Sequence, residues 1–190
     1  MWPGPFATPA PYIAAEAMDL NLAEVTAILA RTPATLRALL EDLPQPWLDA
    51  NDGEGTFSPR DVLGHLIHGE KTDWIPRLER ILQSGESRPF DPFDRTGFGA
   101  LAAMATEGLL AEFTTLRAAN LATLSRQNLT PDQLALAGMH PALGPVTLGQ
   151  LLATWAVHDL NHIDQIVRVM SKRYAERVGP WKAYLGILNR

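Results

Sequence analysis

Hydrophobic residues recur every three to four positions in four long parts of the chain, which places them on one face of an α-helix. These predicted helical segments cover residues 20–43, 58–83, 98–127 and 147–173. Val, Ile, Thr and aromatic residues never alternate over more than a few positions, so strands are not expected. The pattern therefore predicts an all-α fold, and four main helices favour a four-helix bundle.

Capping residues and prolines indicate where these helices begin and bend. Ser58-Pro59 fits a helix start, with serine as the cap and proline in the first turn. Thr32-Pro33 has the same form inside the first segment, so we expect two short helices there. Pro76 lacks a backbone N–H and is expected to kink or break the second helix. A capping box at Thr147–Gln150 starts the fourth helix, and residues 84–97 are expected to be irregular.

The two ends of the chain differ from its helical middle. Prolines crowd the first dozen positions and predict an extended N-terminal arm over residues 1–19. Residues 174–190 are expected to form a C-terminal tail that packs on the bundle. The apolar stretch 181–188 within it is also a candidate homodimer surface. No glycine-serine linker or internal repeat indicates a second domain, so residues 1–190 are expected to form one domain.

Charge and cysteine content exclude several classes of function. The chain of 190 residues carries a net charge of −5, the wrong sign for a surface that neutralises phosphates, so nucleic acid is not an expected partner. It has no cysteine, which excludes disulfides, thiolate zinc sites and cysteine nucleophiles. Neither a basic signal-peptide region nor a long apolar run occurs. We therefore expect a cytoplasmic protein with no membrane partner. The partner that we expect is a small-molecule substrate.

Four of the five histidines lie in two predicted helices, and this clustering is the main chemical signal. His158 and His162 are four residues apart, so a helix places them on one face, where they can chelate one ion. Leu151, Trp155 and Ile166 fall on the same side of that helix, which points the histidine pair inward. A divalent metal would satisfy both buried imidazoles. The alternative is a pair of core histidines bonded to carbonyls or carboxylates.

A third ligand must come from another helix. His65 lies nearer the inward edge marked by Val62, whereas His68 lies nearer solvent, so His65 is the expected ligand. His140 stands in a predicted loop before the fourth helix, close to the expected mouth of the bundle. It is a candidate for contact with substrate.

The segment from His158 to His162 also resembles the HExxH helix of zinc proteases. That motif needs glutamate as the general base in its second position, and Asp159 is one methylene shorter. No serine nucleophile elbow, P-loop or dinucleotide-binding glycine motif occurs either. The sequence therefore gives little support to a protease, serine hydrolase or nucleotide-binding function.

Two stretches resemble the helical signatures of the DinB-like superfamily, which includes the YfiT-type metal-dependent hydrolases. They are FSPRDVLGHL at residues 57–66 and TLGQLLATWAVHDLNHIDQ at residues 147–165. The resemblance covers nearly the whole chain and implies an up-down-down-up four-helix bundle with one divalent ion, nickel or zinc. It implies that His65, His158 and His162 hold this ion, the same three residues that the helical geometry selects.

Other residues near these histidines have weaker assignments. Asp159 and Gln165 lie near the ligand face, where either can orient an imidazole, although Asp159 can equally cap a neighbouring group. Trp155 is expected to pack in the core rather than to stack on a substrate.

Three functions are compatible with these residues. Some members of the resembled family are S-transferases that use bacillithiol, mycothiol or glutathione. This implies a metal-dependent transferase that activates a low-molecular-weight thiol cosubstrate, and it is our first hypothesis. The alternative is a hydrolase that uses a metal-activated water, for which the sequence identifies no general base. A further alternative is a non-catalytic stress or metal-binding protein with the same bundle.

Overall fold

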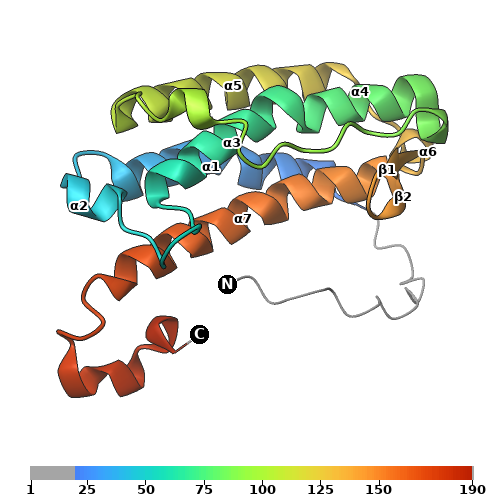
Figure 1. Cartoon of the computed structure of the whole chain (residues 1–190). Helices are drawn as coiled ribbons and strands as arrows, with labels where there is room; N and C mark the ends of the chain where they lie inside the picture. Colours follow the sequence, from blue (N-terminus) through green and yellow to red (C-terminus); the bar gives the residue numbers. More distant parts are fainter. Residues whose placement is uncertain (1–19, 190) are drawn as a thin grey trace.

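Four long helices form the body of the molecule in a computed structural model that describes residues 20–189 (Figure 1). They are α1 (Leu22–Leu40), α3 (Pro59–Thr72) with its continuation α4 (Trp74–Ser84), α5 (Thr106–Arg126) and α7 (Leu148–Lys172). The predicted N-terminal arm, residues 1–19, lies outside the described part of the chain.

The long helices have the predicted up-down-down-up order. α1 and α7 run in one direction, whereas α3 and α5 run in the opposite one (Figure 1). Both α1 and α3 pack against α5 and α7. Because α3 and α5 are parallel, the chain must return along the bundle between them. Residues 85–105 make this crossing and contain two short 3-10 helices, Gly85–Ser87 and Gly99–Leu101.

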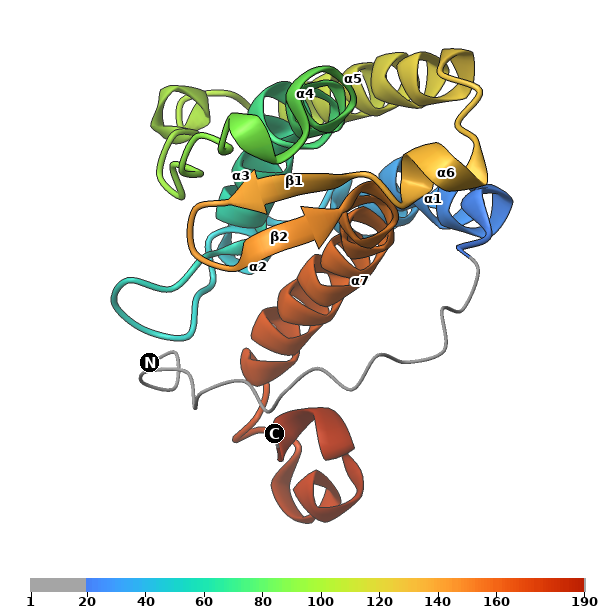
Figure 2. The ribbon, with the colours of Figure 1, turned by 90° about the vertical axis from the view of Figure 1, so that its right-hand side faces the viewer.

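A short β-hairpin closes one end of the bundle, where no strand was expected. β1 (Ala137–His140) pairs antiparallel with β2 (Gly144–Thr147), next to the short helix α6 (Pro131–Leu134) (Figure 2). Each strand has four residues, which is too short to produce a recognisable alternation of apolar and polar positions. His140 therefore ends a strand instead of lying in a loop.

The second predicted helix breaks before Pro76, as expected. Pro76 has no N–H to bond the carbonyl oxygen of Thr72, and its ring crowds that carbonyl. The helix accordingly ends at Thr72 and restarts at Trp74, with Asp73 between them at φ −113° and ψ −66°. α4 thus leaves the line of α3.

The prediction of two short helices around Thr32-Pro33 is wrong, because α1 continues through both residues. Pro33 leaves the carbonyl oxygen of Leu29 without its helical donor, and Nη1 of Arg117 donates to that oxygen over 2.8 Å. Thr32 does not cap a new helix, since its hydroxyl donates to Asp159 Oδ2 over 2.6 Å. Contacts with α5 and α7 therefore keep α1 a single continuous helix.

Smaller differences concern the connections. The third predicted helix starts at Thr106, eight positions after the expected 98, because the 3-10 turn Gly99–Leu101 precedes it. A short helix, α2 (Gln45–Leu48), follows α1. The fourth helix begins at the predicted capping box, in which Thr147 Oγ1 accepts from Gln150 N and Gln150 Oε1 accepts from Thr147 N.

The C-terminal tail contacts the bundle through α7. It contains the 3-10 helices Gly179–Tyr184 and Gly186–Leu188, and the second of these packs against α7. Trp181 and Tyr184 remain 72% and 84% exposed. These exposed rings fit the expected homodimer surface, which stays a prediction.

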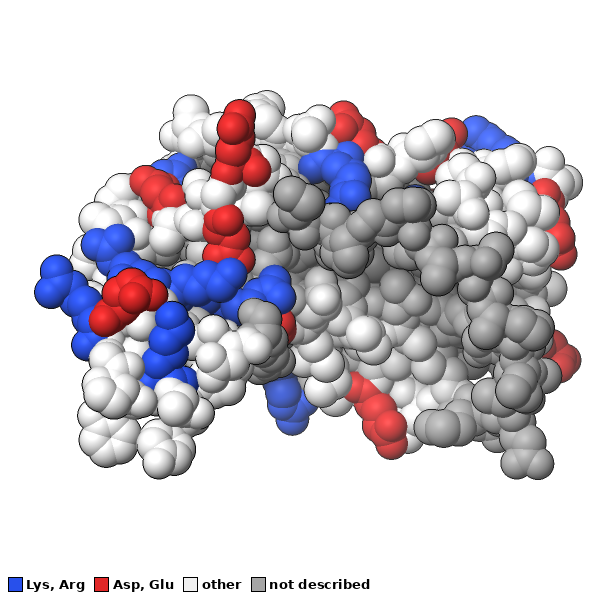
Figure 3. All heavy atoms as spheres, turned by 60° about the horizontal axis from the view of Figure 1, so that its bottom comes forward, with Lys and Arg blue, Asp and Glu red and all other residues white. Residues whose placement is uncertain are grey.

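Charge on the surface is mixed, and the described helices show no membrane span. On the face turned forward in Figure 3, Lys and Arg side chains gather at one end together with Asp and Glu. Near the end of α7, Lys172 pairs with Asp52 at 2.7 Å and Lys182 with Glu176 at 3.1 Å. Within residues 20–189, no helix combines the length and the hydrophobicity needed to cross a bilayer.

Two groups of buried apolar side chains fill the bundle. One lies at the hairpin end and includes Trp74 and Trp155, which stack with ring centroids 5.6 Å apart. The other lies toward the opposite end and includes Ile67 and Phe113. Trp155 is fully buried, which confirms its predicted place in the core.

Candidate metal centre

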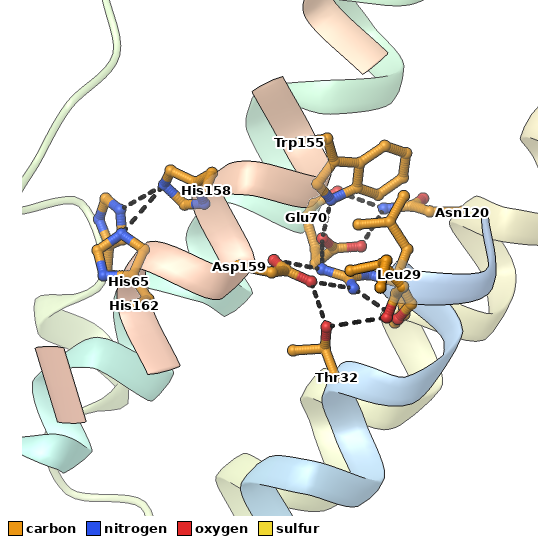
Figure 4. Close-up of polar contacts among 11 residues, drawn as sticks. Leu29, Thr32, His65, Glu70, Asn120, Trp155, His158, Asp159 and His162 are labelled. Carbon is orange, nitrogen blue, oxygen red and sulfur yellow. Dashed lines mark hydrogen bonds and ion pairs between the residues drawn. The ribbon is translucent and has the colours of Figure 1, made fainter. Parts of the chain in front are cut away.

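Three histidines meet between α3 and α7, about midway along the bundle. His65 lies on α3, and His158 and His162 lie one turn apart on α7 (Figure 4). The helical spacing on α7 puts both of its histidines on the side that faces α3. His65 and His162 are buried, and the three residues are grouped so that one ring nitrogen of each lies within 4.8 Å of the others. The structure therefore brings together the three residues selected from the sequence.

The Nε2 atoms of the three rings converge. His158 Nε2 lies 3.2 Å from His65 Nε2 and 3.1 Å from His162 Nε2. Zinc bound by imidazoles at about 2.0–2.1 Å in a tetrahedral site would hold its nitrogen ligands roughly 3.3 Å apart. The observed separations are thus close to those of a bound ion, and the three imidazoles fit a divalent metal.

Hydrogen bonding alone does not account for this arrangement. Gln165 Oε1 lies 2.8 Å from His162 Nδ1, so this nitrogen carries the proton and Nε2 of His162 presents a lone pair. If His158 Nε2 carries a proton, it can bond His162 but cannot also accept from His65. If it carries none, two lone pairs face each other across 3.1 Å. A cation at the centre would satisfy all three lone pairs together.

The second nitrogens of the rings differ in their partners. Gln165 orients His162, as the sequence suggested. Nδ1 of His65 and Nδ1 of His158 are buried and have no hydrogen-bond partner among the described residues. Leaving a buried N–H unpaired costs about 1–3 kcal/mol, so this cluster is not an arrangement that stability alone favours.

The rings of the cluster are neutral near pH 7. Burial lowers the pKa of His65 to about 4 and that of His158 to about 2, and the charges of neighbouring groups add to both shifts. Burial also lowers the pKa of His162, although the Gln165 contact opposes this. Neutral imidazoles keep the lone pairs that metal binding requires.

Aromatic side chains surround His65. Phe57, Phe93 and Phe98 have ring centroids 5.7, 5.4 and 6.5 Å from that of His65. Phe93 and Phe98 belong to the crossing segment, which rests on α3 at Gly64. A Cβ at Gly64 would lie only 2.7 Å from Phe98 Cδ2, so the glycine allows this close approach. The crossing segment therefore shields the cluster on the α3 side.

A buried charged network lies on the other side of α7 (Figure 4). Asp159 accepts from Arg117 at 2.5 and 3.0 Å, through Nη1 and Nη2. Arg117 Nη2 also donates to Glu70 Oε1 at 2.8 Å, and Trp155 Nε1 donates to the same oxygen at 3.0 Å. Asp159 therefore binds Arg117 and Thr32 and orients no imidazole. Of the two roles suggested from the sequence, the structure shows the capping of a neighbouring group.

Sequence reasoning missed Arg117 and Glu70. Arg117 lies one helical turn after Phe113 and two turns before Leu124, both buried, so it is a charge on an apolar face. Glu70 stands one turn after the buried Leu66 on α3. A charged residue in an apolar stripe usually has a buried partner of opposite charge, and this signal was present in the sequence.

A cavity of about 260 Å³ opens beside the histidine cluster. His65 and His158 form part of its lining, together with apolar side chains from α4, α7, the hairpin and the crossing segment. His140 also lines this cavity, and its contact with substrate stays a prediction. His68 is half-buried, packs on Phe93 and does not belong to the three-histidine group.

Comparisons with known proteins agree with this architecture. Residues 28–166 match the family model of the DinB superfamily. The structure is similar to that of YfiT from Bacillus subtilis, a probable metal-dependent hydrolase with an unusual four-helix bundle topology. The TM-score is 0.68, with 24% sequence identity over 91% of this chain and 94% of that chain. A search of curated proteins gave no match. Since the family match spans most of the sequence, the chain belongs to the DinB superfamily.

Proposed function

We propose that this protein is a metal-dependent hydrolase that acts on one small organic molecule. The observation that carries the proposal is that His65 and His158 belong both to the convergent cluster and to the wall of the cavity. A molecule in the cavity would therefore touch the place where three imidazoles can hold an ion. The likeness to YfiT, a probable metal-dependent hydrolase, supports the same class of function.

The residues of the chain have separate roles in this proposal. His65, His158 and His162 would hold the ion, and Gln165 fixes the tautomer of His162 by accepting from Nδ1. A bound divalent ion supplies Lewis acidity, which lowers the pKa of water toward 7 and polarises a carbonyl oxygen. The apolar cavity wall excludes bulk water from the rest of the substrate and limits its orientations.

Asp73 is the one carboxylate among the described lining residues of the cavity. It is eight residues from His65, which corresponds to about 12 Å along a helix. Its Oδ1 is also held by Arg77 Nε at 2.6 Å. We therefore assign Asp73 to the ion pair and not to proton transfer at the metal centre.

The size of the cavity favours hydrolysis over thiol transfer. Pockets for single drug-sized ligands usually occupy about 300–1,000 Å³, and this cavity has about 260 Å³. Such a volume suits one small molecule better than an electrophile together with a low-molecular-weight thiol. The transferase hypothesis and its thiol cosubstrate remain predictions, which the activity assay described below tests by adding thiols.

The first experiment is elemental analysis of full-length protein made without a histidine tag. We expect about one divalent ion per chain, zinc or nickel, and its loss in His162→Ala. His68→Ala is the matched control, since it removes a nearby imidazole outside the cluster and should keep the ion. Wild-type protein that binds neither metal after incubation with both would contradict the proposal.

Activity is then measured on metal-loaded protein with panels of aryl esters and amides, with and without added thiols. Cleavage without thiol that disappears in His162→Ala but persists in His68→Ala supports the hydrolase. Metal-dependent conjugation of a chlorodinitrobenzene to a thiol, without any cleavage, would instead establish the transferase. A bound ion with no turnover in either panel would favour the non-catalytic alternative.

A further inference from the structure

The cavity is elongated, with the histidine cluster at one end. Along α3 and α4 its lining residues recur every four positions, as His65, Gly69, Asp73 and Arg77. Along α7, which runs antiparallel to them, Thr154 and Gln150 lead away from His158 at the same spacing. Gln150 is eight residues from His158, which corresponds to about 12 Å along α7. Arg77 is twelve residues from His65, beyond the break at Asp73, so both side chains lie toward the end remote from the metal centre.

The walls between these ends are apolar. Trp74, Phe90 and Phe93 line the cavity together with Leu143, Val146 and Leu151. A ligand that fills this space must present an aromatic or aliphatic body, because an unpaired polar group placed there would lose its hydrogen bonds to water.

Arg77 carries unused hydrogen-bond donors at the remote end. Its Nε pairs with Asp73 Oδ1 at 2.6 Å, and the guanidinium lies over the Phe90 ring at 5.1 Å. Among the described residues, neither Nη atom of Arg77 has a hydrogen-bond acceptor, although the side chain is only 12% exposed. One edge of the guanidinium is therefore held in place while its terminal N–H groups stay available.

His140 offers a second donor. Its Nδ1 accepts from the backbone N–H of Ala142 and of Leu143, each at 3.1 Å. A nitrogen that accepts two N–H groups carries no proton, so the proton of the neutral ring must be on Nε2. The turn of the hairpin thus fixes His140 as a hydrogen-bond donor from Nε2.

Gln150 adds donors in the same way. Its Oε1 accepts from Thr147 N at 2.9 Å in the cap of α7, which leaves the amide NH2 group free to donate. The acceptor atoms of His140 and Gln150 are therefore already engaged, and Arg77 has no acceptor atom. All three side chains still have N–H groups that can donate into this part of the cavity. Such a set matches a ligand group that only accepts, and a carboxylate is the organic group of that kind that pairs with arginine.

We propose that the cavity binds a small substrate with an apolar body and a terminal carboxylate. The carboxylate lies at the end of the cavity remote from the metal centre, where Arg77 binds it and His140 and Gln150 donate to it. The opposite end of the molecule meets the three histidines. The placement of the reactive end rests on the proposed function. Recognition of the carboxylate does not, since Arg77, His140 and Gln150 belong to the chain whether or not an ion is bound.

The test is isothermal titration calorimetry of metal-free, full-length protein with a series of phenylalkanoates, from phenylacetate to phenylhexanoate, and their primary amides. We expect at least one acid of suitable length to bind about tenfold more tightly than its amide, the gain of a charge-assisted hydrogen bond that is partly screened. Arg77→Gln should abolish this preference. Arg80→Gln is the matched control, because Arg80 lies on the same helix but pairs with Asp91 outside the cavity lining.

Arg77→Gln leaves the buried Asp73 without its partner, so the double variant Asp73→Asn/Arg77→Gln is measured as well. The double variant removes both charges of the ion pair, so no unpaired charge is left buried and the protein should fold. It should bind each acid and its amide with equal affinity. Equal affinities in wild type, absence of binding throughout the series, or a preference that survives Arg77→Gln would each overturn the proposal. An acid preference that arises only after metal is added would also overturn it, since the carboxylate would then be at the metal centre. Because this titration needs neither metal nor turnover, its outcome is independent of the hydrolase assay.

Discussion

Arg117 donates from Nη1 to the carbonyl oxygen of Leu29 over 2.8 Å. In an uninterrupted helix this oxygen would accept from the backbone N–H of residue 33, and Pro33 has none. Arg117 thus replaces a donor that α1 cannot supply. Since the same guanidinium also pairs with Glu70 and Asp159, one side chain of α5 bonds to all three of the other long helices.

Arg117→Leu should destabilise the protein by about 3–5 kcal/mol, because Glu70 and Asp159 would remain buried without their cation. Urea unfolding of metal-free protein measures the free energy of unfolding. Arg126→Leu, at the exposed end of the same helix, serves as the control and should change it by no more than about 0.5 kcal/mol. A loss below about 1 kcal/mol in Arg117→Leu would show that the network contributes little.

The bond to Leu29 can be isolated by combining Arg117→Leu with Pro33→Ala. In the wild-type background, the new N–H at position 33 would compete for a carbonyl that Arg117 already occupies. In the Arg117→Leu background the carbonyl is free, so Pro33→Ala should stabilise more there, by about 1 kcal/mol. Strictly additive effects in this double-mutant cycle would mean that Arg117 does not compensate for the proline.

Local sequence signals predicted the features that depend on neighbouring residues. The capping box of Thr147 and Gln150 and the break before Pro76 follow from backbone chemistry within one helical turn. The convergence of His158 and His162 follows from helical periodicity in the same way. The third histidine had to come from a second helix. His65 was chosen there because it lies nearer than His68 to the apolar, inward face of that helix.

Features that depend on distant residues were not predictable in this way. Proline inside a helix normally kinks or breaks it, and the contacts that compensate within α1 come from Arg117, 88 residues from Leu29, and from Asp159, 127 residues from Thr32. The hairpin was missed because its strands are short and one of them begins at Gly144. The polar end of the cavity was missed because Arg77 and His140 come together only when the hairpin folds against α4.

Gln165→Leu should weaken metal binding by about 10- to 100-fold while the three histidines stay in place, because His162 loses the acceptor that fixes its tautomer. Gln165→Glu keeps an acceptor oxygen and should bind metal at least as well as wild type. The dissociation constant is measured by competition with a metal-binding dye. Asn161→Leu, at an exposed position of α7, controls for effects on the helix. Unchanged affinity in Gln165→Leu would exclude an orienting role.

Metal-free protein should lose stability as the pH falls below about 6.5. Burial lowers the pKa of folded His65 to about 4, and the charges of His162, Arg95 and His68 also disfavour its charged form. The unfolded chain therefore binds protons first, and the free energy of unfolding declines between the unfolded and folded pKa values, by up to roughly 3 kcal/mol for this residue. Urea unfolding in the presence of a chelator, at about pH 7.5 and about pH 5, measures the decline. The free energy of unfolding of His65→Asn should decline less over this pH range. A wild-type free energy of unfolding that stays constant would contradict the lowered pKa of His65.

Gly64→Ala should disturb the metal centre from the side of the crossing segment. The added methyl group would lie 2.7 Å from Phe98 Cδ2 and 3.3 Å from Phe98 Cβ, so the ring cannot remain over α3. We expect a loss of about 1–3 kcal/mol in stability from overpacking, together with a His65 ring that is more open to water. Histidine NMR titration should then report a rise in the pKa of His65 from its lowered value toward the ordinary one. Gly99→Ala is the matched control in the same segment, because a Cβ there meets no other atom within 4 Å. If Gly64→Ala and Gly99→Ala behave alike, the close approach of Phe98 to α3 does not determine how well His65 is shielded.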